Sequence, residues 1–277
     1  MLPVKITKLI KGRLIREGAG VKLQRYIGLE RSNDLEPLLL LDYFDSCDPL
    51  DFMAGFPPHP HRGFETITYL WHGAISHEDN KGHKGRIAAG DVQWMTAGRG
   101  IVHSEMPDAN SPRLQGLQLW LNLPAAEKMC PPRYQEYAAT ELPVEQHASG
   151  AVVKVIAGST DKGTCSPISG IATEPLFFEL KLPAQTQIQQ SIPAGYSVVL
   201  LLISGQAKIE GQIIEALTLA SLTNEGGLLT IEAEQDSVMV LIAARILAEP
   251  IVRHGPFVMN TQEEIISALN DFRSGQF

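Results

Sequence analysis

Apolar residues in this chain come in short runs that are broken by Gly, Pro, Asn and Asp. This pattern is typical of an all-β sandwich or barrel and not of strands that alternate with helices. In the first half it predicts strands over Leu35–Phe44, Thr66–Trp71 and Asp91–Met95, and a turn at Asn80–Gly82. In the second half it predicts strands over Leu176–Leu182, Ser197–Ile203, Ala207–Ile209, Leu217–Leu222, Leu228–Ala233 and Ser237–Ala243.

The composition changes between Pro124 and Pro143, where prolines punctuate a polar stretch. We therefore predict a domain boundary here. The predicted domains are a first barrel over residues 1–125, a linker over 126–145 and a second barrel over 146–277.

A faint internal repeat relates the two predicted barrels. Aligning Tyr69–Gly73 with Leu201–Gly205 gives an offset of 205 − 73 = 132 residues. The same offset places Ser191 and Pro193 where the first barrel has His59 and His61. The second barrel is therefore expected to hold no metal and to serve as structural cover or as a partner surface.

Helical periodicity is strong only near the C-terminus. Thr261 followed by Glu264 fits a capping box, and Ile265, Leu269 and Phe272 then fall on one face. We expect a short helix that packs on a barrel.

Two doublets of potential metal ligands flank the segment between Gly55 and Glu105. His59 and His61 are two residues apart, as are His103 and Glu105. Residues i and i+2 of a strand project from the same face, so each pair can face one cavity. Three imidazoles and a carboxylate suit a divalent first-row metal ion better than calcium. The spacing thus predicts a metal site.

Charge and cysteine content narrow the class of protein. The 31 acidic against 23 basic residues give a net charge of −8, without a Lys/Arg-rich run, which argues against direct nucleic-acid binding. The three cysteines have no CxxC spacing and favour a reducing cytoplasm over a disulfide framework. Wholly apolar runs such as Val198–Ile203 are far too short to span a membrane. A cytoplasmic protein is expected.

The residues around the doublets resemble the pirin family of the cupin superfamily. The resemblance rests on FPPHPHRGFET over Phe56–Thr66, on GDVQWMTAGRGIVHSE over Gly90–Glu105, and on the tail from Glu249 to Thr261. It implies a bicupin of two jelly-roll β-barrels, with one non-haem iron in the first barrel only. The family's ligands fall on His59, His61, His103 and Glu105.

The carboxylate ligand is the least certain member of this set. A generic cupin pattern would take it from the first motif, where Glu65 shares strand parity with His59 and His61. The pirin pattern uses Glu105, which shares parity with His103. We favour Glu105 and assign Glu65 as a supporting partner or surface acid.

A shell of three histidines and one carboxylate leaves positions open for oxygen activation, so Fe(II) is our first choice, with manganese, cobalt, nickel and copper admissible. The resemblance further implies flavonol (quercetin) 2,3-dioxygenase activity. In that chemistry Glu105, or a water, removes the 3-hydroxyl proton of the flavonol, oxygen attacks the ring, and carbon monoxide leaves with a depside as the second product.

Side chains near the doublets supply candidates for the substrate pocket: Phe44, Phe56, Arg62, Gln93, Trp94 and Met95. For Phe44, Phe56, Trp94 and Met95, ordinary core packing is the favoured interpretation. His72, His77 and His83 lie between the doublets and are expected to be strand-end or loop histidines instead of ligands.

Two other functions compete with an oxygenase. Pirins also include redox-sensitive regulators that bind proteins, in which case the iron state would control a partner surface. A sugar-modifying cupin is a weaker hypothesis, because nothing beside the doublets resembles a nucleotide-sugar site.

Overall fold

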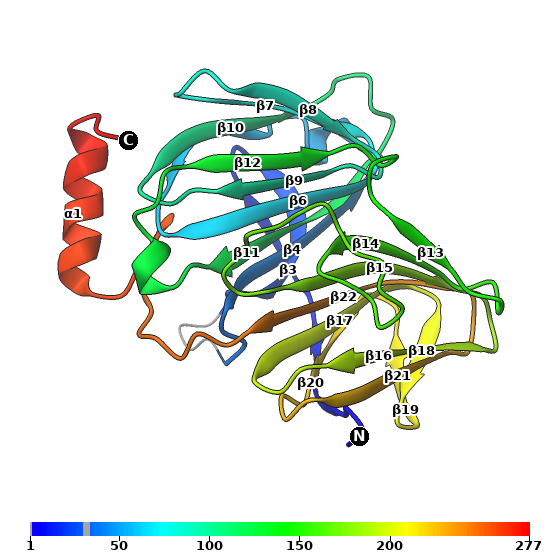
Figure 1. Ribbon diagram of the computed structural model, residues 1–277. Helices are drawn as coiled ribbons and strands as arrows, with labels where there is room; N and C mark the ends of the chain where they lie inside the picture. The colour runs from blue at the N-terminus through cyan, green and yellow to red at the C-terminus, as the bar shows by residue number, and fades with distance from the viewer. Residues whose placement is uncertain (1, 30–33) are drawn as a thin grey trace. The chain divides into compact units, whose positions relative to one another are not determined.

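The computed structural model describes residues 2–29 and 34–277, which fold into two units (Figure 1). The first barrel comprises Arg13–Ala139 and Leu247–Phe277. The second barrel comprises the segment up to Gly12 together with Thr140–Ile246. The sheets of both units are antiparallel.

In its described part, the first barrel consists of a seven-stranded sheet, in the order β12-β9-β6-β11-β4-β3-β2, and a four-stranded sheet, β5-β10-β7-β8. The strands are β2 (Arg13–Glu17), β3 (Val21–Ile27), β4 (Leu38–Ser46), β5 (Phe56–His61), β6 (Phe64–His72), β7 (Ala74–Asp79), β8 (Lys84–Ala88), β9 (Val92–Thr96), β10 (Ile101–Pro107), β11 (Leu114–Asn122) and β12 (Arg133–Tyr137). Two 3-10 turns, η1 (Pro49–Asp51) and η2 (Ala125–Glu127), lie in its connections.

The second barrel repeats this plan within the described residues, with a seven-stranded sheet β1-β20-β17-β22-β15-β14-β13 and a four-stranded sheet β16-β21-β18-β19. Its strands are β1 (Ile6–Lys11), β13 (Val144–Gln146), β14 (Val152–Ala157), β15 (Leu176–Leu182), β16 (Thr186–Ile192), β17 (Tyr196–Ser204), β18 (Gln206–Ile209), β19 (Gln212–Glu215), β20 (Thr218–Leu222), β21 (Gly227–Ala233) and β22 (Ser237–Arg245).

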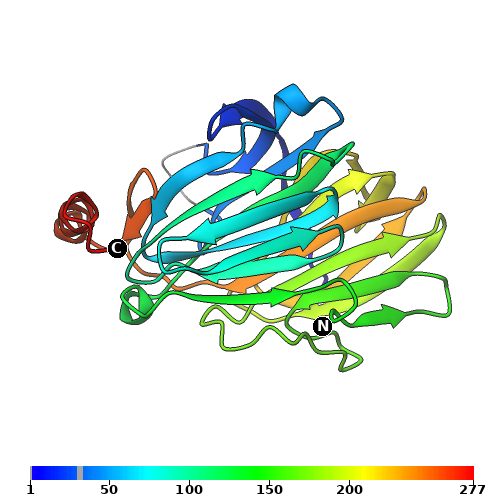
Figure 2. The same cartoon turned by 90° about the horizontal axis from the view of Figure 1, so that it is seen from above.

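The tail of the chain is part of the first barrel. It forms the hairpin β23 (Val252–His254) and β24 (Phe257–Met259) and the helix α1 (Gln262–Arg273), which lies beside the hairpin in Figure 2. The predicted capping box is present, since Thr261 accepts from the Glu264 N–H and the Glu264 carboxylate accepts from the Thr261 N–H. Among the described residues, no helix is long and apolar enough to cross a membrane.

These units differ from the predicted domains at both chain ends. Strand β1, predicted with the first barrel, pairs with β20 of the second, and Leu247–Phe277, predicted with the second, belongs to the first. The predicted linker contains β12, which pairs with β9, and the first two residues of β13, which pairs with β14. Hydrogen-bonded pairing can join strands that are far apart in sequence, and a composition shift does not report it.

The predicted strands and the repeat are confirmed. Every predicted strand overlaps an observed one, and Leu176–Leu182 matches β15 residue for residue. Strands β6 and β17 begin 196 − 64 = 132 residues apart and end 204 − 72 = 132 residues apart. Both are buried on two faces over nearly their whole length, which is why they read as long apolar runs.

Candidate metal centre

The two ligand doublets lie on neighbouring strands of the four-stranded sheet. Strands β5 and β10 pair antiparallel, with His59 opposite His103 and His61 opposite Ile101. Strand β5 is at the edge of its sheet, and only there can Pro57, Pro58 and Pro60 be accommodated without losing ladder hydrogen bonds. The proline-rich sequence therefore fixes a stiff edge strand that presents both histidines.

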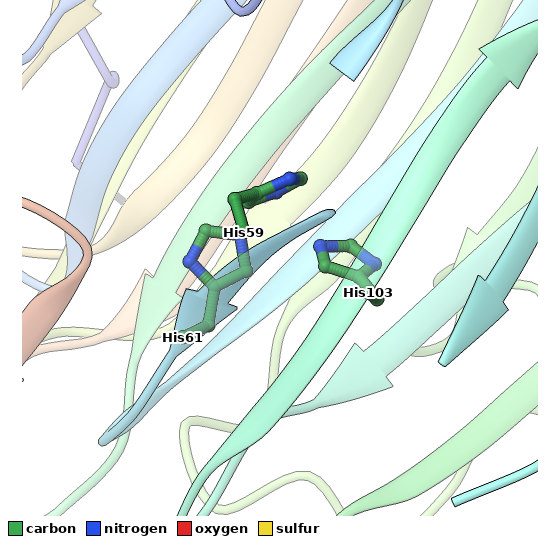
Figure 3. A group of neighbouring side chains, drawn as sticks. All are labelled: His59, His61 and His103. Carbon is green, nitrogen blue, oxygen red and sulfur yellow. The ribbon is translucent and has the colours of Figure 1, made fainter. Parts of the chain in front are cut away.

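Three of the four predicted ligands converge (Figure 3). The candidate ligand atoms of His59, His61 and His103 lie within 4.8 Å of one another, and the imidazole centroids are 4.5–5.0 Å apart. His61 and His103 are 3% and 1% exposed, while His59 is half-buried. Imidazoles that converge in this way form the arrangement expected of a metal site.

Buried ring nitrogens without partners test whether an ion fits. Within the described residues, Nδ1 of His61 and both ring nitrogens of His103 have no hydrogen-bond partner. Leaving buried polar atoms unpaired costs about 1–3 kcal/mol each, a cost that coordination to an ion removes. The Nδ1 of His59 donates to the Pro57 carbonyl (2.9 Å), which leaves Nε2 as the lone-pair donor. The residues present thus fit a bound metal ion.

Electrostatics favour the neutral, ligating form of these rings. Burial, reinforced by His103 and His59, lowers the pKa of His61 well below its usual value. Burial likewise lowers the pKa of His103 to about 4, against the opposing effect of Glu105. Both rings are therefore unprotonated at neutral pH, as metal ligation requires.

Glu105 lies on β10 with the same strand parity as His103, and it is 3% exposed. One carboxylate oxygen accepts from Thr68 Oγ1 (3.1 Å), and the other accepts from Gln118 Nε2 (3.0 Å). Thr68 and Gln118 come from β6 and β11 of the opposite sheet. Sequence reasoning missed both donors, because nothing in the local sequence marks a residue as the partner of a carboxylate on another strand.

Glu65, the alternative carboxylate, lies on β6 at odd parity relative to Thr68, so the two side chains leave opposite faces of that strand. Its carboxylate accepts from Thr96 Oγ1 (2.6 Å). Burial raises the pKa of Glu65 to about 7. Gly63, at φ +88°, separates β5 from β6, and this turn breaks the parity that linked Glu65 to the histidines in the sequence.

A small cavity adjoins Glu105. The centre of a water molecule can move within about 10 Å³ of this cavity, which is enough space for about one water molecule. Its walls are mostly apolar and include two of the predicted pocket residues; the lining is Leu23, Asp42, Phe44, Phe56, Thr68, Ile75, Glu105 and Gln118.

The other four predicted pocket residues do not line this cavity. Arg62 is buried and its guanidinium bonds Asp271 (2.7 Å). Gln93 donates to Glu136, and Met95 packs in a cluster with Ala97 and Ile101. Trp94 projects from the face of β9 opposite to Gln93, as its strand parity requires.

Residues of the C-terminal tail contact Arg62 and Trp120 next to the histidine cluster, and no sequence pattern predicted these contacts. Besides Asp271, Arg62 contacts the ring of Phe277, whose centroid is 4.4 Å from the guanidinium carbon. The indole of Trp120 packs against His61 at 5.1 Å and lies under Arg253. These contacts hold Arg62, the residue after His61, in place, and they cover one side of the His61 ring.

A buried lysine ties the tail to the same region. Lys128 is 1% exposed, and its Nζ donates to the carbonyls of Gly63 and Val258 and to the side chain of Asn122. Burial lowers the pKa of Lys128 to about 8. Through these hydrogen bonds, Lys128 holds the turn after β5 against β24.

Comparison with known proteins agrees with this geometry. A family model described as pirin matches residues 20–121, and one described as pirin C-terminal cupin domain matches residues 177–277. A pirin-like protein of Caulobacter vibrioides is 42% identical over 277 residues, which is all of both chains. Human pirin is 42% identical over 279 residues, covering 98% of this chain and 93% of its own.

A solved structure shows the same fold over the full length. The crystal structure of a quercetin 2,3-dioxygenase from Acinetobacter baumannii superposes with a TM-score of 0.92 at 32% identity, covering 100% of this chain and 99% of its own. Two antiparallel barrels of this type, with ligand doublets in one, define a bicupin. The chain belongs to the pirin family.

Proposed function

We propose that this protein is a non-haem iron dioxygenase that opens the central ring of a flavonol by breaking its C2–C3 and C3–C4 bonds, so that C3 leaves as carbon monoxide and both atoms of O2 enter the depside. The observation that carries the proposal is the cluster of His59, His61 and His103, with its unpartnered buried nitrogens. The full-length similarity to a structure described as quercetin 2,3-dioxygenase supports it. His59, His61, His103 and Glu105 would hold one Fe(II) ion.

The ion would supply a Lewis acid for the 3-hydroxy-4-oxo edge of the flavonol and a route for electrons to oxygen. The protein supplies the remaining functions. The carboxylate of Glu105 accepts the 3-hydroxyl proton, and Thr68 and Gln118 hold that carboxylate in place. Phe44, Phe56 and Ile75 keep the site apolar and exclude water.

The size of the cavity adds a requirement. A three-ring flavonol is much larger than the water-sized space beside Glu105, so side chains must move on binding. Phe56 begins the edge strand β5 and is only half-buried, which makes it the side chain expected to move. We expect Phe56→Ala to lower the KM for quercetin.

The test uses the full chain loaded anaerobically with Fe(II). Flavonol absorbance, oxygen uptake and carbon monoxide release are followed together, and we expect one of each per turnover. Glu105→Gln should reduce kcat by about 10²–10⁴-fold, the usual contribution of a general base. Glu65→Gln is the matched control, and it should retain activity because its side chain leaves the other face of β6.

An iron-loaded chain that takes up no oxygen with any flavonol would contradict the proposal. If that chain instead bound a protein with an affinity that differed between its ferrous and ferric states, the regulatory alternative would replace it.

A further inference from the structure

A second group of metal-ligating side chains lies in the first barrel beside the centre described above, since His77 of β7 is opposite Glu105 of β10. His77 is on β7, His83 precedes β8, and Glu136 is on β12. Their candidate ligand atoms lie within 4.8 Å of one another. His77 is 4% exposed and sits in the middle of its strand, so the prediction of a strand-end or loop histidine is wrong for this residue.

The distances between these side chains are close to, and in one case shorter than, those between two ligands of one small ion. Oε1 of Glu136 lies 2.9 Å from His77 Nε2 and 3.3 Å from His83 Nε2. Two ligands bound tetrahedrally at about 2.0–2.1 Å from zinc are about 3.3 Å apart. Despite the short approach, neither ring nitrogen of His77 makes a hydrogen bond of acceptable geometry to any described residue.

The surroundings hold these side chains in place. Gln93 Nε2 donates to Glu136 Oε1 (2.8 Å), and the ring of Tyr134 stacks on His83 with centroids 4.2 Å apart. Metal sites in proteins depend on such outer contacts to orient their ligands.

Gly85 leaves room for the side chains of His77 and Glu136. A Cβ on Gly85 would collide with the His77 ring and come within 3.0 Å of Glu136 Oε2. Gly85 is on β8, and its backbone is not in the left-handed region, so conformation alone does not require glycine there. Glycine is required there because the side chains of His77 and Glu136 occupy the space that a Cβ would need.

We propose that His77, His83 and Glu136 form a second binding site, for a divalent first-row ion of the zinc type. Two imidazoles and one carboxylate are a usual ligand set for zinc with water in the fourth position. Water can reach it, because the side chains of His83 and Glu136 are 39% and 27% exposed. The ion would join the β7–β8 hairpin to β12, and this inference does not depend on the proposed oxygenase function.

The experiment measures Zn²⁺ bound per metal-stripped full chain by equilibrium dialysis. The wild-type chain should bind two ions, and His59→Ala/His103→Ala should retain one. In that double-variant background, Glu136→Gln and His83→Ala should each weaken the remaining site at least tenfold. His254→Ala, at an exposed histidine of β23, is the matched control and should change neither site.

Cobalt provides a second measurement. The visible absorption of Co²⁺ in the His59→Ala/His103→Ala chain should show a four- or five-coordinate ion, and this absorption should disappear with His83→Ala. Since His83 lies outside the strands and is partly exposed, this variant should fold even if Glu136→Gln does not. The proposal is overturned if the double variant binds no zinc, or if His83→Ala binds it as tightly as its parent.

Discussion

Strands β6 and β17 occupy the same place in the two barrels and differ in what they present to the interior. The 132-residue offset aligns Thr68 with Leu200. Thr68 donates to Glu105, whereas Leu200 belongs to the apolar cluster of its barrel. One backbone plan thus carries a polar interior in one copy and a hydrocarbon interior in the other.

The edge strands show the same contrast. β5 carries His59 and His61, while the aligned positions are Ser191 on β16 and Pro193 just after it, and Ile188 of β16 packs in the apolar cluster. Buried polar groups cost free energy unless they are paired, so the first barrel gives up packing to build its centre. The first barrel therefore buries polar groups around its three histidines, whereas the second barrel buries mainly apolar side chains.

The largest effect is expected from the apolar barrel. Leu200→Ala removes a fully buried side chain and should lower the free energy of unfolding by about 2–5 kcal/mol. Urea denaturation measures this change. The iron content should stay at the wild-type level, since no proposed ligand lies in that barrel. Loss of iron by a folded Leu200→Ala chain would break the division of roles.

The next effect concerns Glu65 and depends on pH. Its pKa is raised from 4.5 to about 7 in the folded chain, so the folded state holds a proton that the unfolded state loses. Stability therefore falls as pH rises from about 4.5 to 7, by about 3 kcal/mol in total. Glu65→Gln should remove this loss and stabilise the chain at pH 8 but not at pH 4. An equal difference at both pH values in urea titrations would contradict this account.

A smaller effect is expected where the polar interior supports Glu105. Gln118→Leu removes a donor to that carboxylate and should weaken Fe(II) binding about 10–100-fold. Gln115→Leu, on the same strand but bonded to Tyr43, is the matched control for loss of a buried amide. Equal iron affinities for the two variants would show that Gln118 does not act on the centre.

The smallest effect is expected at the tail. Thr261→Ala removes the N-cap of α1 and should cost about 1 kcal/mol of local stability. Hydrogen exchange at the α1 amides should quicken accordingly, while amides of β17 should exchange as in the wild type. Unchanged exchange in α1 would show that the cap does not hold the helix that supplies Asp271 to Arg62.

What the sequence predicted and what it missed have a common physical cause. The ligand doublets could be found because i, i+2 spacing is local, and the repeat because β6 and β17 have the same length. Thr68 and Gln118 support Glu105, and Asp271 pairs with Arg62, only through contacts between distant segments. Such partners have no local pattern.

The predicted domain boundaries were wrong at both chain ends for a similar reason. Nothing in Ile6–Lys11 specifies that its partner is β20, which lies more than half the chain away. The apolar face of α1 predicted packing without naming the surface, and the helix belongs with the first barrel. Amphipathic patterns define a face to be buried and leave its partner open.

The most direct test of the central claim is an anomalous-difference map at the iron edge from crystals of the Fe(II)-loaded chain. We expect a peak about 2.0–2.2 Å from one nitrogen each of His59, His61 and His103 and from a carboxylate oxygen of Glu105. A peak next to the carboxylate of Glu65 instead, or iron absent from these histidines in crystals that contain it elsewhere, would contradict this ligand assignment.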